Sequence, residues 1–328
     1  MESVLECLPR GSRVAILRLR SLGDCVLTTP ALDILKSCRG DLRVAVAVED
    51  LFRAIFEDNP GVDEIMRPEL AALRKWNPLL CLNLHGGSRS AWMTAGSGAR
   101  YRAGFGHYRH QFVYNIRIPR AQEILGVART VHTAEHLASA MFYLGAPVTE
   151  IPRAKLVPEE GGRGPGAGGR ISEPNVRSEC FPRPPAPGIR PPFAVIHPVA
   201  ATPEKTWRAD GFLAVAEYLK ESGLEPVFIG GAGDDLSPFR RYRTIAGAPL
   251  SEIKTLLSTA SLFVGNDSGP AHMAAAFGVP EVVIFGNSDP AIWGPWRTVS
   301  EVIAAPGGIT RVETAQVLDA LQRLRVTA

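Results

Sequence analysis

The chain alternates short apolar runs with stretches whose apolar residues recur at helical spacing, and it does this in two separate series. The runs RVAILRL at 13–19 and FAVIH at 193–197 have the length of buried strands and contain the β-branched residues that strands favour. Because strands that alternate with helices pair in parallel, each series predicts a parallel sheet covered by helices on both faces. The chain is therefore predicted to be an α/β protein with two sheets.

Further segments extend the alternation in both series. In the first, we expect strands at 42–48, 63–66 and 79–84 and helices at 26–36, 51–56, 70–76 and 130–144. In the second, we expect strands at 226–230, 261–265 and 281–285 and helices at 211–221, 250–259, 271–277 and 312–324.

Residues 158–192 interrupt the alternation. Nine prolines and seven glycines occupy these 35 positions, a composition that does not sustain a packed core. Its glycine spacing loosely matches a dinucleotide fingerprint, but no strand precedes it and no helix follows, so we assign no nucleotide site there. The segment predicts a linker or long exposed loop between domains 1–157 and 193–328. Ligands of such domains bind beyond the carboxyl ends of the strands, which here would face a central cleft.

The overall composition excludes several classes of protein. With 45% apolar residues, the chain is neither disordered nor fibrous. Only five cysteines occur, which excludes a disulfide scaffold, and none of them form a CxxC metal or redox pair. No apolar run approaches the roughly 20 residues that span a bilayer, and the first residues, MESVLECLPRGSR, lack the apolar core of a signal peptide. We therefore expect a cytoplasmic protein.

Charge is distributed unevenly between the two halves. Residues 1–157 contain 20 lysines and arginines against 15 aspartates and glutamates, whereas residues 193–328 contain 11 against 14. No carboxylate lies between Glu69 and Glu123, a stretch that contains Arg74, Lys75, Arg89, Arg100, Arg102, Arg109, Arg117 and Arg120. Such a stretch favours an anionic ligand over a cleft, although a solvated surface is the alternative. Nucleic acid is not an expected partner, because the pI is only about 8.6 and no recognition helix is evident.

Within this stretch we single out Arg100, Arg102 and Arg109 as candidate anion-binding residues. Glycines at 98, 104 and 106 interrupt regular structure around them, which predicts an exposed loop. On such a loop the three arginines would bind carboxylates or phosphates of an anionic ligand.

Asp24 follows the first predicted strand in the turn Arg20-Ser21-Leu22-Gly23-Asp24. A carboxylate at this place has two interpretations. It can be an ordinary cap of the helix that begins there, or a general base directed into the cleft.

Two loops of the second half contain polar residues suited to a nucleotide. The loop 197–207 contains Thr202 and Lys205, and the lysine could neutralise a phosphate. Alternatively, it is a surface lysine beside the packing side chain of Trp207. The glycine-rich turn 230–235 contains Asp234 and Asp235, either of which could accept hydrogen bonds from a ribose, unless the turn is only flexible.

The loop 264–272, Val-Gly-Asn-Asp-Ser-Gly-Pro-Ala-His, places a polar turn between an apolar strand and an alanine-rich helix. Unpaired N–H groups and the dipole at the start of a helix favour a diphosphate. The alternative is that Asp267 is a cap and His272 a core histidine. No DxD pair and no histidine–cysteine cluster with metal-ligand spacing occurs in the sequence, so a metal-assisted mechanism has no support from it.

Four segments between about Arg13 and Trp296 resemble, in order, the signature segments of glycosyltransferase family 9: LRLRSLGDCVLTTPALDILK, HPVAATPEKTWRADGF, LSEIKTLLSTASLFVGNDSGPAHMAAAFGVP and VVIFGNSDPAIWGPW. That family includes the ADP-heptose:lipopolysaccharide heptosyltransferases. The resemblance implies the GT-B architecture, in which two Rossmann-like domains face a central cleft. It places the acceptor on the N-terminal side and the nucleotide sugar on the C-terminal side, which agrees with the charge difference.

The resemblance also implies roles for individual residues. Asp24 matches the catalytic base, and Lys205 matches the lysine that contacts the donor phosphate. The donor site that it implies also includes Thr202, Asp234, Leu250, Asp267, Ser268, Gly269 and His272. Among these, Leu250 would lie against the adenine, and Asp234 or Asp235 would contact the ribose.

The implied reaction is a metal-independent glycosyl transfer with inversion, from ADP-heptose to a hydroxyl of the lipopolysaccharide core. The acceptor would be an anionic glycan or glycolipid bound by Arg100, Arg102 and Arg109. Through this acceptor the protein would make peripheral contact with the inner membrane surface. The chain departs from the family at Ala200 and Ala201, where relatives often have phosphate-contacting residues, and at Thr206 and Arg208, so other donors and acceptors stay open. A non-catalytic sugar-nucleotide-binding protein is a further alternative. A dehydrogenase would show GxGxxG after its first strand, which RLRSLGD does not supply.

Overall fold

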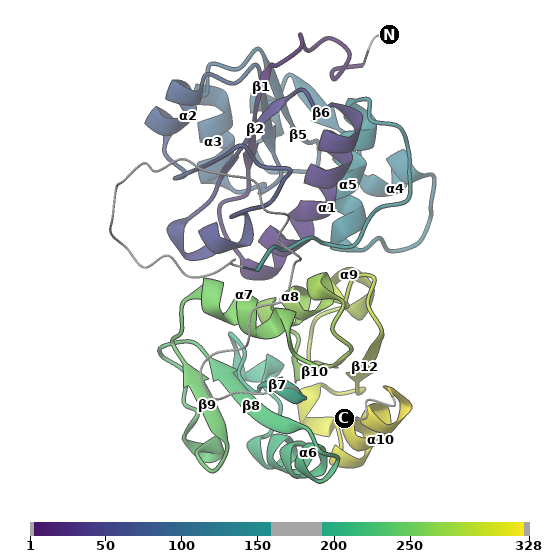
Figure 1. The fold of residues 1–328 in the computed structure, drawn as a ribbon. Helices are drawn as coiled ribbons and strands as arrows, with labels where there is room; N and C mark the ends of the chain where they lie inside the picture. The colour runs from purple at the N-terminus through teal and green to yellow at the C-terminus, as the bar shows by residue number, and fades with distance from the viewer. Residues whose placement is uncertain (1–2, 159–191, 325–328) are drawn as a thin grey trace, which may run out of the picture.

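The computed structural model describes residues 3–158 and 192–324. Figure 1 shows an N-terminal domain (purple to teal) above a C-terminal domain (green to yellow), each built around one sheet. The predicted linker 158–192 lies, except for its first and last residues, outside the described residues. The two-domain α/β fold expected from the alternation is confirmed.

The N-terminal sheet has six strands in the order β3-β2-β1-β4-β5-β6. All neighbouring strands run parallel. Its strands are β1 Arg13–Leu17, β2 Arg43–Ala47, β3 Glu64–Met66, β4 Leu80–Asn83, β5 Tyr101–Phe105 and β6 Ile116–Ile118. The first four were predicted, whereas β5 and β6 were not, because arginine and glycine interrupt their apolar runs.

The C-terminal sheet has the order β12-β11-β10-β7-β8-β9 and is also parallel. Its strands are β7 Phe193–His197, β8 Glu225–Gly230, β9 Arg243–Ala246, β10 Leu262–Asn266, β11 Glu281–Phe285 and β12 Ser300–Ala304. The strands β9 and β12 were not predicted. Both lie at the edges of the sheet and are only partly buried, so they lack the continuous apolar run of a central strand.

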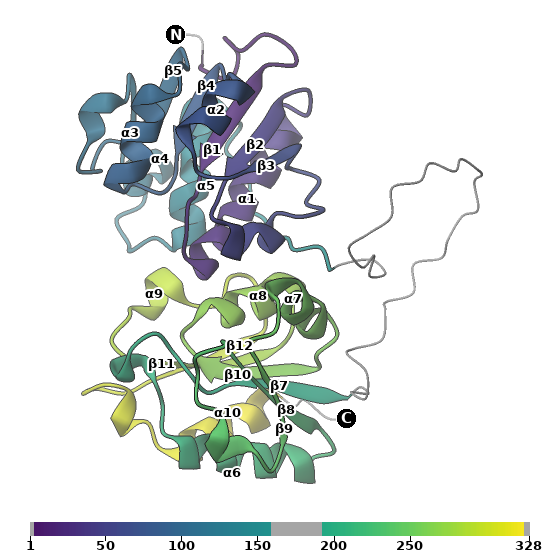
Figure 2. The same cartoon turned by 90° about the vertical axis from the view of Figure 1, so that its left-hand side faces the viewer.

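Helices cover both sheets (Figures 1 and 2). The α-helices are α1 Leu22–Cys38, α2 Leu70–Trp76, α3 Ser88–Gly96, α4 Ala121–Leu125, α5 Thr133–Leu144, α6 Ala209–Glu221, α7 Leu250–Ser258, α8 Gly269–Phe277, α9 Pro290–Trp293 and α10 Thr314–Leu324. The 3₁₀ turns are η1 Asp50–Ile55, η2 Gln111–Val113, η3 Pro203–Lys205, η4 Ser237–Phe239 and η5 Ile309–Arg311. Among the described helices, none has the length and apolar character needed to cross a bilayer.

The region around Gly104 differs from the expected exposed loop. Residues Tyr101–Phe105 form the strand β5, and Gly104 is buried within it. A Cβ atom on Gly104 would lie 2.6 Å from the ring of Tyr114. The glycine therefore allows an aromatic ring to pack on the strand, and it does not mark a break in the structure as the sequence had suggested.

Both sheets place the first strand of their domain between the second and the fourth. The connections after β1 and β4, and likewise after β7 and β10, therefore diverge and leave a crevice at the carboxyl ends of these strands. The N-terminal end of α1 lies against α8 (Figures 1 and 2), and a Cβ on Gly269 would lie only 2.5 Å from the side chain of Leu22. The crevices of the two sheets thus meet at the domain boundary.

Candidate active site

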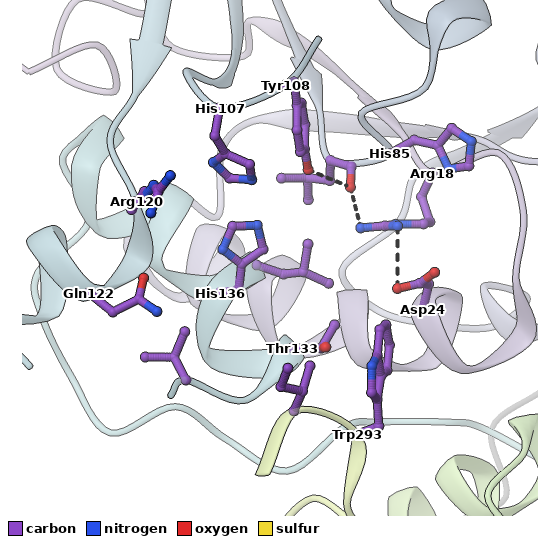
Figure 3. Close-up of a pocket in the computed structure, with 14 residues that line it drawn as sticks. Arg18, Asp24, His85, His107, Tyr108, Arg120, Gln122, Thr133, His136 and Trp293 are labelled. Atoms are coloured by element: carbon purple, nitrogen blue, oxygen red, sulfur yellow. Dashed lines mark hydrogen bonds and ion pairs between the residues drawn. The ribbon is translucent and has the colours of Figure 1, made fainter. Parts of the chain in front are cut away.

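A cavity of about 450 Å³ lies at the crevice of the N-terminal sheet. Figure 3 shows that Arg18, Asp24 and His85 line one side of it. Arg18 is the first residue after β1. At the end of β4, the side-chain oxygen of Asn83 accepts hydrogen bonds from the N–H groups of His85 and Gly86, at 3.0 Å each, and so positions the loop that contains His85. Trp293 of α9 closes the cavity from the other domain. The cavity is therefore complete only when both domains are in place.

Asp24 lies in the first turn of α1 and does not cap it. The helix begins at Leu22 with Ser21 as its N-cap, and Ser21 has a φ of 74°, a strained conformation for a residue with a side chain. The carboxylate of Asp24 lies 3.6 Å from a guanidinium nitrogen of Arg18. The interpretation of Asp24 as an ordinary cap is therefore wrong, and the strained turn instead directs the carboxylate into the cavity.

Arg18 is almost fully buried, with 4% of its surface exposed. Its guanidinium donates a hydrogen bond to the carbonyl oxygen of Leu84 and pairs with Asp24. A buried charge is expensive unless it is paired, so the guanidinium and the carboxylate stabilise each other. The ion pair holds the Asp24 carboxylate next to Arg18 on the wall of the cavity.

Three histidines line the same cavity: His85, His107 and His136. Burial lowers the pKa of all three, and for His136 to about 4. The ring of His136 also stacks on Phe105, with the centroids 3.9 Å apart. The lowered pKa values favour the uncharged form of these rings, which has one hydrogen-bond donor and one acceptor. The positive charge at the cavity comes from Arg18 and Arg120.

On the other side of the domain boundary, Lys205 and Asp267 form an ion pair. The Lys205 Nζ lies 2.9 Å from Asp267 Oδ2, and Ser288 donates a hydrogen bond to the same carboxylate oxygen. Asp267 directly follows β10, and its side chain is only 7% exposed, whereas that of Lys205 is 31% exposed. The buried carboxylate thus holds a lysine whose ammonium group can reach a ligand.

Helix α8 begins at Gly269, and Ser268 precedes it at the N-cap position without a capping hydrogen bond from its side chain. The side-chain oxygen of Ser268 instead lies 2.9 Å from Nδ1 of His197, at the end of β7. Because Pro270 has no N–H, the donors that this terminus can offer to an anion next to Lys205 are the N–H groups of Ser268 and Gly269. The predicted residues Lys205, Asp267, Ser268 and Gly269 are therefore brought together by the carboxyl ends of β7 and β10.

His272 lies below this terminus, in contact with the other domain. A Cβ on Gly23 would lie 2.5 Å from its Cδ2 atom. Burial lowers the pKa of His272 to about 4, so the ring is neutral. The structure gives His272 a packing role between α8 and α1, and its predicted contact with the donor stays a prediction.

A second, mainly apolar cavity of about 260 Å³ adjoins the Lys205 site. Leu250, Ile253 and Ile229 line it together with His197. At its rim, the Asp234 carboxylate accepts the N–H of Gly231 at 2.6 Å and closes the turn. The predicted adenine contact, Leu250, is therefore placed in an apolar site of the kind that a flat base requires.

Thr202 lies at the start of η3, where its carbonyl oxygen accepts the N–H of Lys205. Its side chain is exposed, and it lines neither cavity. Its predicted donor contact stays a prediction.

The three arginines expected to bind the acceptor do not line the larger cavity. The guanidinium of Arg100 lies over the Tyr101 ring, 5.4 Å from its centroid. Arg102 donates to the carbonyl oxygen of Val113 at 3.1 Å, and Arg109 is exposed. Acceptor binding by these three arginines remains a prediction. From the same carboxylate-free stretch, Arg120 does line the cavity.

The sequence analysis missed Arg18, the three histidines and Trp293 as lining residues. Arg18 lies one residue after the end of β1, and His85 lies two residues after the end of β4. Because ligands bind at the carboxyl ends of parallel strands, these positions could have identified both residues from the sequence. His107 and His136 carried no signal of that kind, since one follows an unpredicted strand and the other lies within the helix α5.

Comparisons with known proteins agree with this geometry. Residues 72–315 match the family model of glycosyltransferase family 9 (heptosyltransferase). The lipopolysaccharide heptosyltransferase 3 of Escherichia coli (strain K12) is 32% identical over 120 residues, which span 33% of this chain and 35% of that protein.

Two solved structures have the same fold. A glycosyltransferase family 9 protein from Veillonella parvula superposes with a TM-score of 0.77 at 20% identity, covering 97% of this chain and 98% of that one. The E. coli ADP-heptose lipopolysaccharide heptosyltransferase II superposes with a TM-score of 0.71 at 19% identity, covering 95% and 98%. With a family model that matches most of its length, the chain belongs to glycosyltransferase family 9.

Proposed function

We propose that the protein is an inverting glycosyltransferase that transfers a heptose from ADP-heptose to a hydroxyl group of a lipopolysaccharide core. One observation carries this proposal: a carboxylate and an anion-binding site lie on opposite sides of a single domain boundary. Asp24 lies on the N-terminal side, and Lys205 with the start of α8 lies on the C-terminal side. A glycosyl transfer needs a base for the attacking hydroxyl and positive charge for the leaving diphosphate.

Asp24 is the proposed base. Its carboxylate accepts the proton of the acceptor hydroxyl while that oxygen forms a bond to the anomeric carbon. The bond from the anomeric carbon to the diphosphate breaks on the opposite face, so the configuration inverts. The ion pair with Arg18 holds the carboxylate in one orientation, which such a proton transfer requires.

The leaving diphosphate is stabilised by Lys205 and by the N–H groups of Ser268 and Gly269. Asp267 holds Lys205 in place through their ion pair, and Ser288 donates a hydrogen bond to the Asp267 carboxylate. In the described part of the chain, no group of three or more His, Cys, Asp or Glu side chains is placed to hold a metal ion. The proposal of metal independence rests on the positive charge that Lys205 and the helix terminus supply.

The identity of the donor is supported by the apolar cavity beside Lys205. It is lined by Leu250, Ile229 and Ile253, and a purine ring would bury apolar surface there. The structural neighbour from E. coli is an ADP-heptose heptosyltransferase, and the relative with 32% identity is a lipopolysaccharide heptosyltransferase. Both names support heptose as the transferred sugar, and that of the structural neighbour supports ADP as its carrier.

For the acceptor, we propose an anionic glycan. Arg18 and Arg120 supply positive charge at the cavity, and the neutral His85, His107 and His136 supply hydrogen-bond partners for sugar hydroxyls. This combination suits a core saccharide with phosphate or carboxylate groups. The cytoplasmic location expected from the sequence remains a prediction.

The test is an assay of the purified full-length protein with ADP-heptose and a phosphorylated core oligosaccharide. We expect release of ADP, addition of one heptose in the mass spectrum, and inversion of the anomeric configuration by NMR. The rate should not change with EDTA. GDP-, UDP- and dTDP-sugars serve as controls, and turnover with one of them alone would replace the proposed donor. Donor binding without transfer to any glycan would instead favour the non-catalytic alternative.

A further inference from the structure

Three aromatic rings form an exposed cluster on the N-terminal domain, outside both cavities. They belong to Trp92 of α3, His110 and Phe112, and the ring centroids of each pair lie 6.0 Å apart. Trp92 is 57% exposed and Phe112 is 61% exposed. We call these three residues the aromatic patch. Figure 2 shows α3 at the outer side of the domain.

The aromatic patch is held on a packed base. Ala91, Val113 and Tyr114 form a small buried cluster next to it, and the side chain of Ser88 hydrogen-bonds the ring of His110 at 2.9 Å. The two exposed rings therefore come from a fixed surface. Clustered and exposed apolar side chains on such a surface mark a place of interaction.

The aromatic patch belongs to the carboxylate-free stretch between Glu69 and Glu123, in which every lysine and arginine adds positive charge. Among the described residues, Arg89 is the only cation of this stretch that pairs with a carboxylate, that of Glu49. Arg109 is exposed and adjoins His110. The surface around the rings can therefore attract an extended anionic partner.

One short segment connects the aromatic patch with the cavity of Asp24. In residues 106–113, His107 and Tyr108 line the cavity, whereas His110 and Phe112 belong to the aromatic patch. Figure 3 shows His107 and Tyr108 side by side on the cavity wall. A surface that binds the aromatic patch would thus lie next to the cavity proposed for the acceptor.

We propose that the aromatic patch docks the protein on an anionic lipid bilayer. Tryptophan and other aromatic rings insert at the level of the lipid headgroups, and arginine beside them binds lipid phosphates. Trp92 and Phe112 supply the rings and Arg109 supplies the charge. The docking needs neither the donor nor the acceptor sugar, so it goes beyond the proposed transfer reaction.

The test is cosedimentation of the full-length protein with two kinds of vesicle. One kind contains phosphatidylcholine only, and the other contains phosphatidylcholine with phosphatidylglycerol. We expect the protein to bind the anionic vesicles and to bind the neutral ones much more weakly. The double variant Trp92→Ser/Phe112→Ser should bind the anionic vesicles about tenfold more weakly, because two exposed rings no longer insert. Arg109→Gln should reduce the preference for anionic over neutral vesicles.

A matched control replaces two exposed apolar residues elsewhere, Val148 at 71% and Val299 at 64% exposure. The variant Val148→Ser/Val299→Ser should bind like the wild type, and all variants should keep the thermal midpoint of unfolding. Wild-type protein that stays in solution with anionic vesicles overturns the proposal, and so does equal binding by the double aromatic variant. The vesicles contain no acceptor glycan, so failure of the proposed transferase reaction does not affect the result.

Discussion

The two domains order their strands in the same way, yet their crevices contain different chemistry. In the N-terminal domain, the connections after β1 and β4 supply a paired carboxylate and His85 to a polar cavity, and His107 and His136 line it from other elements. In the C-terminal domain, the connections after β7 and β10 supply Lys205, Asp267 and a helix N-terminus beside an apolar cavity. The formal charge follows the same division, with +5 in residues 1–157 and −3 in residues 193–328.

This comparison indicates that the strand order sets the position of each crevice, while the residues after the strands set its chemistry. Each sheet opens at its own crevice, between its first and fourth strands. In the proposed reaction, one crevice removes a proton and the other holds a diphosphate. If this division is correct, variants in the two crevices should affect different kinetic quantities.

The largest effect is expected from Asp24→Asn. Loss of a general base typically costs about 10²–10⁴-fold in rate, so kcat should fall by that factor while the Kd for ADP stays unchanged. Steady-state assays of ADP release and calorimetry with ADP measure the two quantities. If the variant keeps more than about a tenth of the wild-type kcat, the base lies elsewhere and the division between the crevices fails.

Lys205→Ala should affect the other crevice, and it should affect binding as well as rate. The ammonium meets phosphate charge in the ground state and in the transition state. Loss of a charge-assisted hydrogen bond corresponds to about a ten- to hundredfold weaker Kd for ADP, with a lower kcat. Lys205→Arg, which keeps the charge, is the control. Calorimetry that shows wild-type affinity in the alanine variant would remove Lys205 from the donor site.

Gly23→Ala tests the contact through which the two crevices meet. The added Cβ would lie 2.5 Å from the His272 ring, and overpacking of this kind costs about 1–3 kcal/mol. We expect a lower thermal midpoint of unfolding in the wild-type background and almost no further change in a His272→Ala background.

The control for this variant is Gly233→Ala, because a Cβ there meets no atom within 4 Å. The four measured midpoints of the Gly23 and His272 variants form a double-mutant cycle. Additive effects of the two substitutions would show that the contact does not couple the domains.

The smallest effect is expected for Arg120→Gln, which should raise the acceptor KM severalfold without changing the Kd for ADP. The guanidinium lines the cavity from an exposed position, where its attraction is weakened by salt. Arg117→Gln, exposed nearby but not lining the cavity, is the control.

The triple variant with Gln at Arg100, Arg102 and Arg109 tests the acceptor contacts expected from sequence. An unchanged KM in that variant and a raised one in Arg120→Gln would assign the acceptor to the cavity alone.

Much of the donor site could be predicted from sequence because its residues cluster in short segments. Asp267, Ser268 and Gly269 are consecutive, and the turn they form follows a strand that is easily recognised. The N-terminal cavity could not be predicted in this way. Its residues Arg18, His85 and His136 come from elements far apart in the chain, and only the parallel pairing of β1 with β4 and the packing of α5 against α1 bring them together.

The sequence alone determined the two α/β series, the strands with continuous apolar runs, and the polar turn at the start of α8. These features depend on residues within a few positions of one another, so a local pattern is sufficient to reveal them. Only the tertiary structure decided that Gly104 lies inside a strand, that Asp24 pairs with Arg18, and that His272 packs beneath Gly23. Each of these depends on side chains that meet across a sheet or a domain boundary, where close packing, and not local sequence preference, fixes which atoms come into contact.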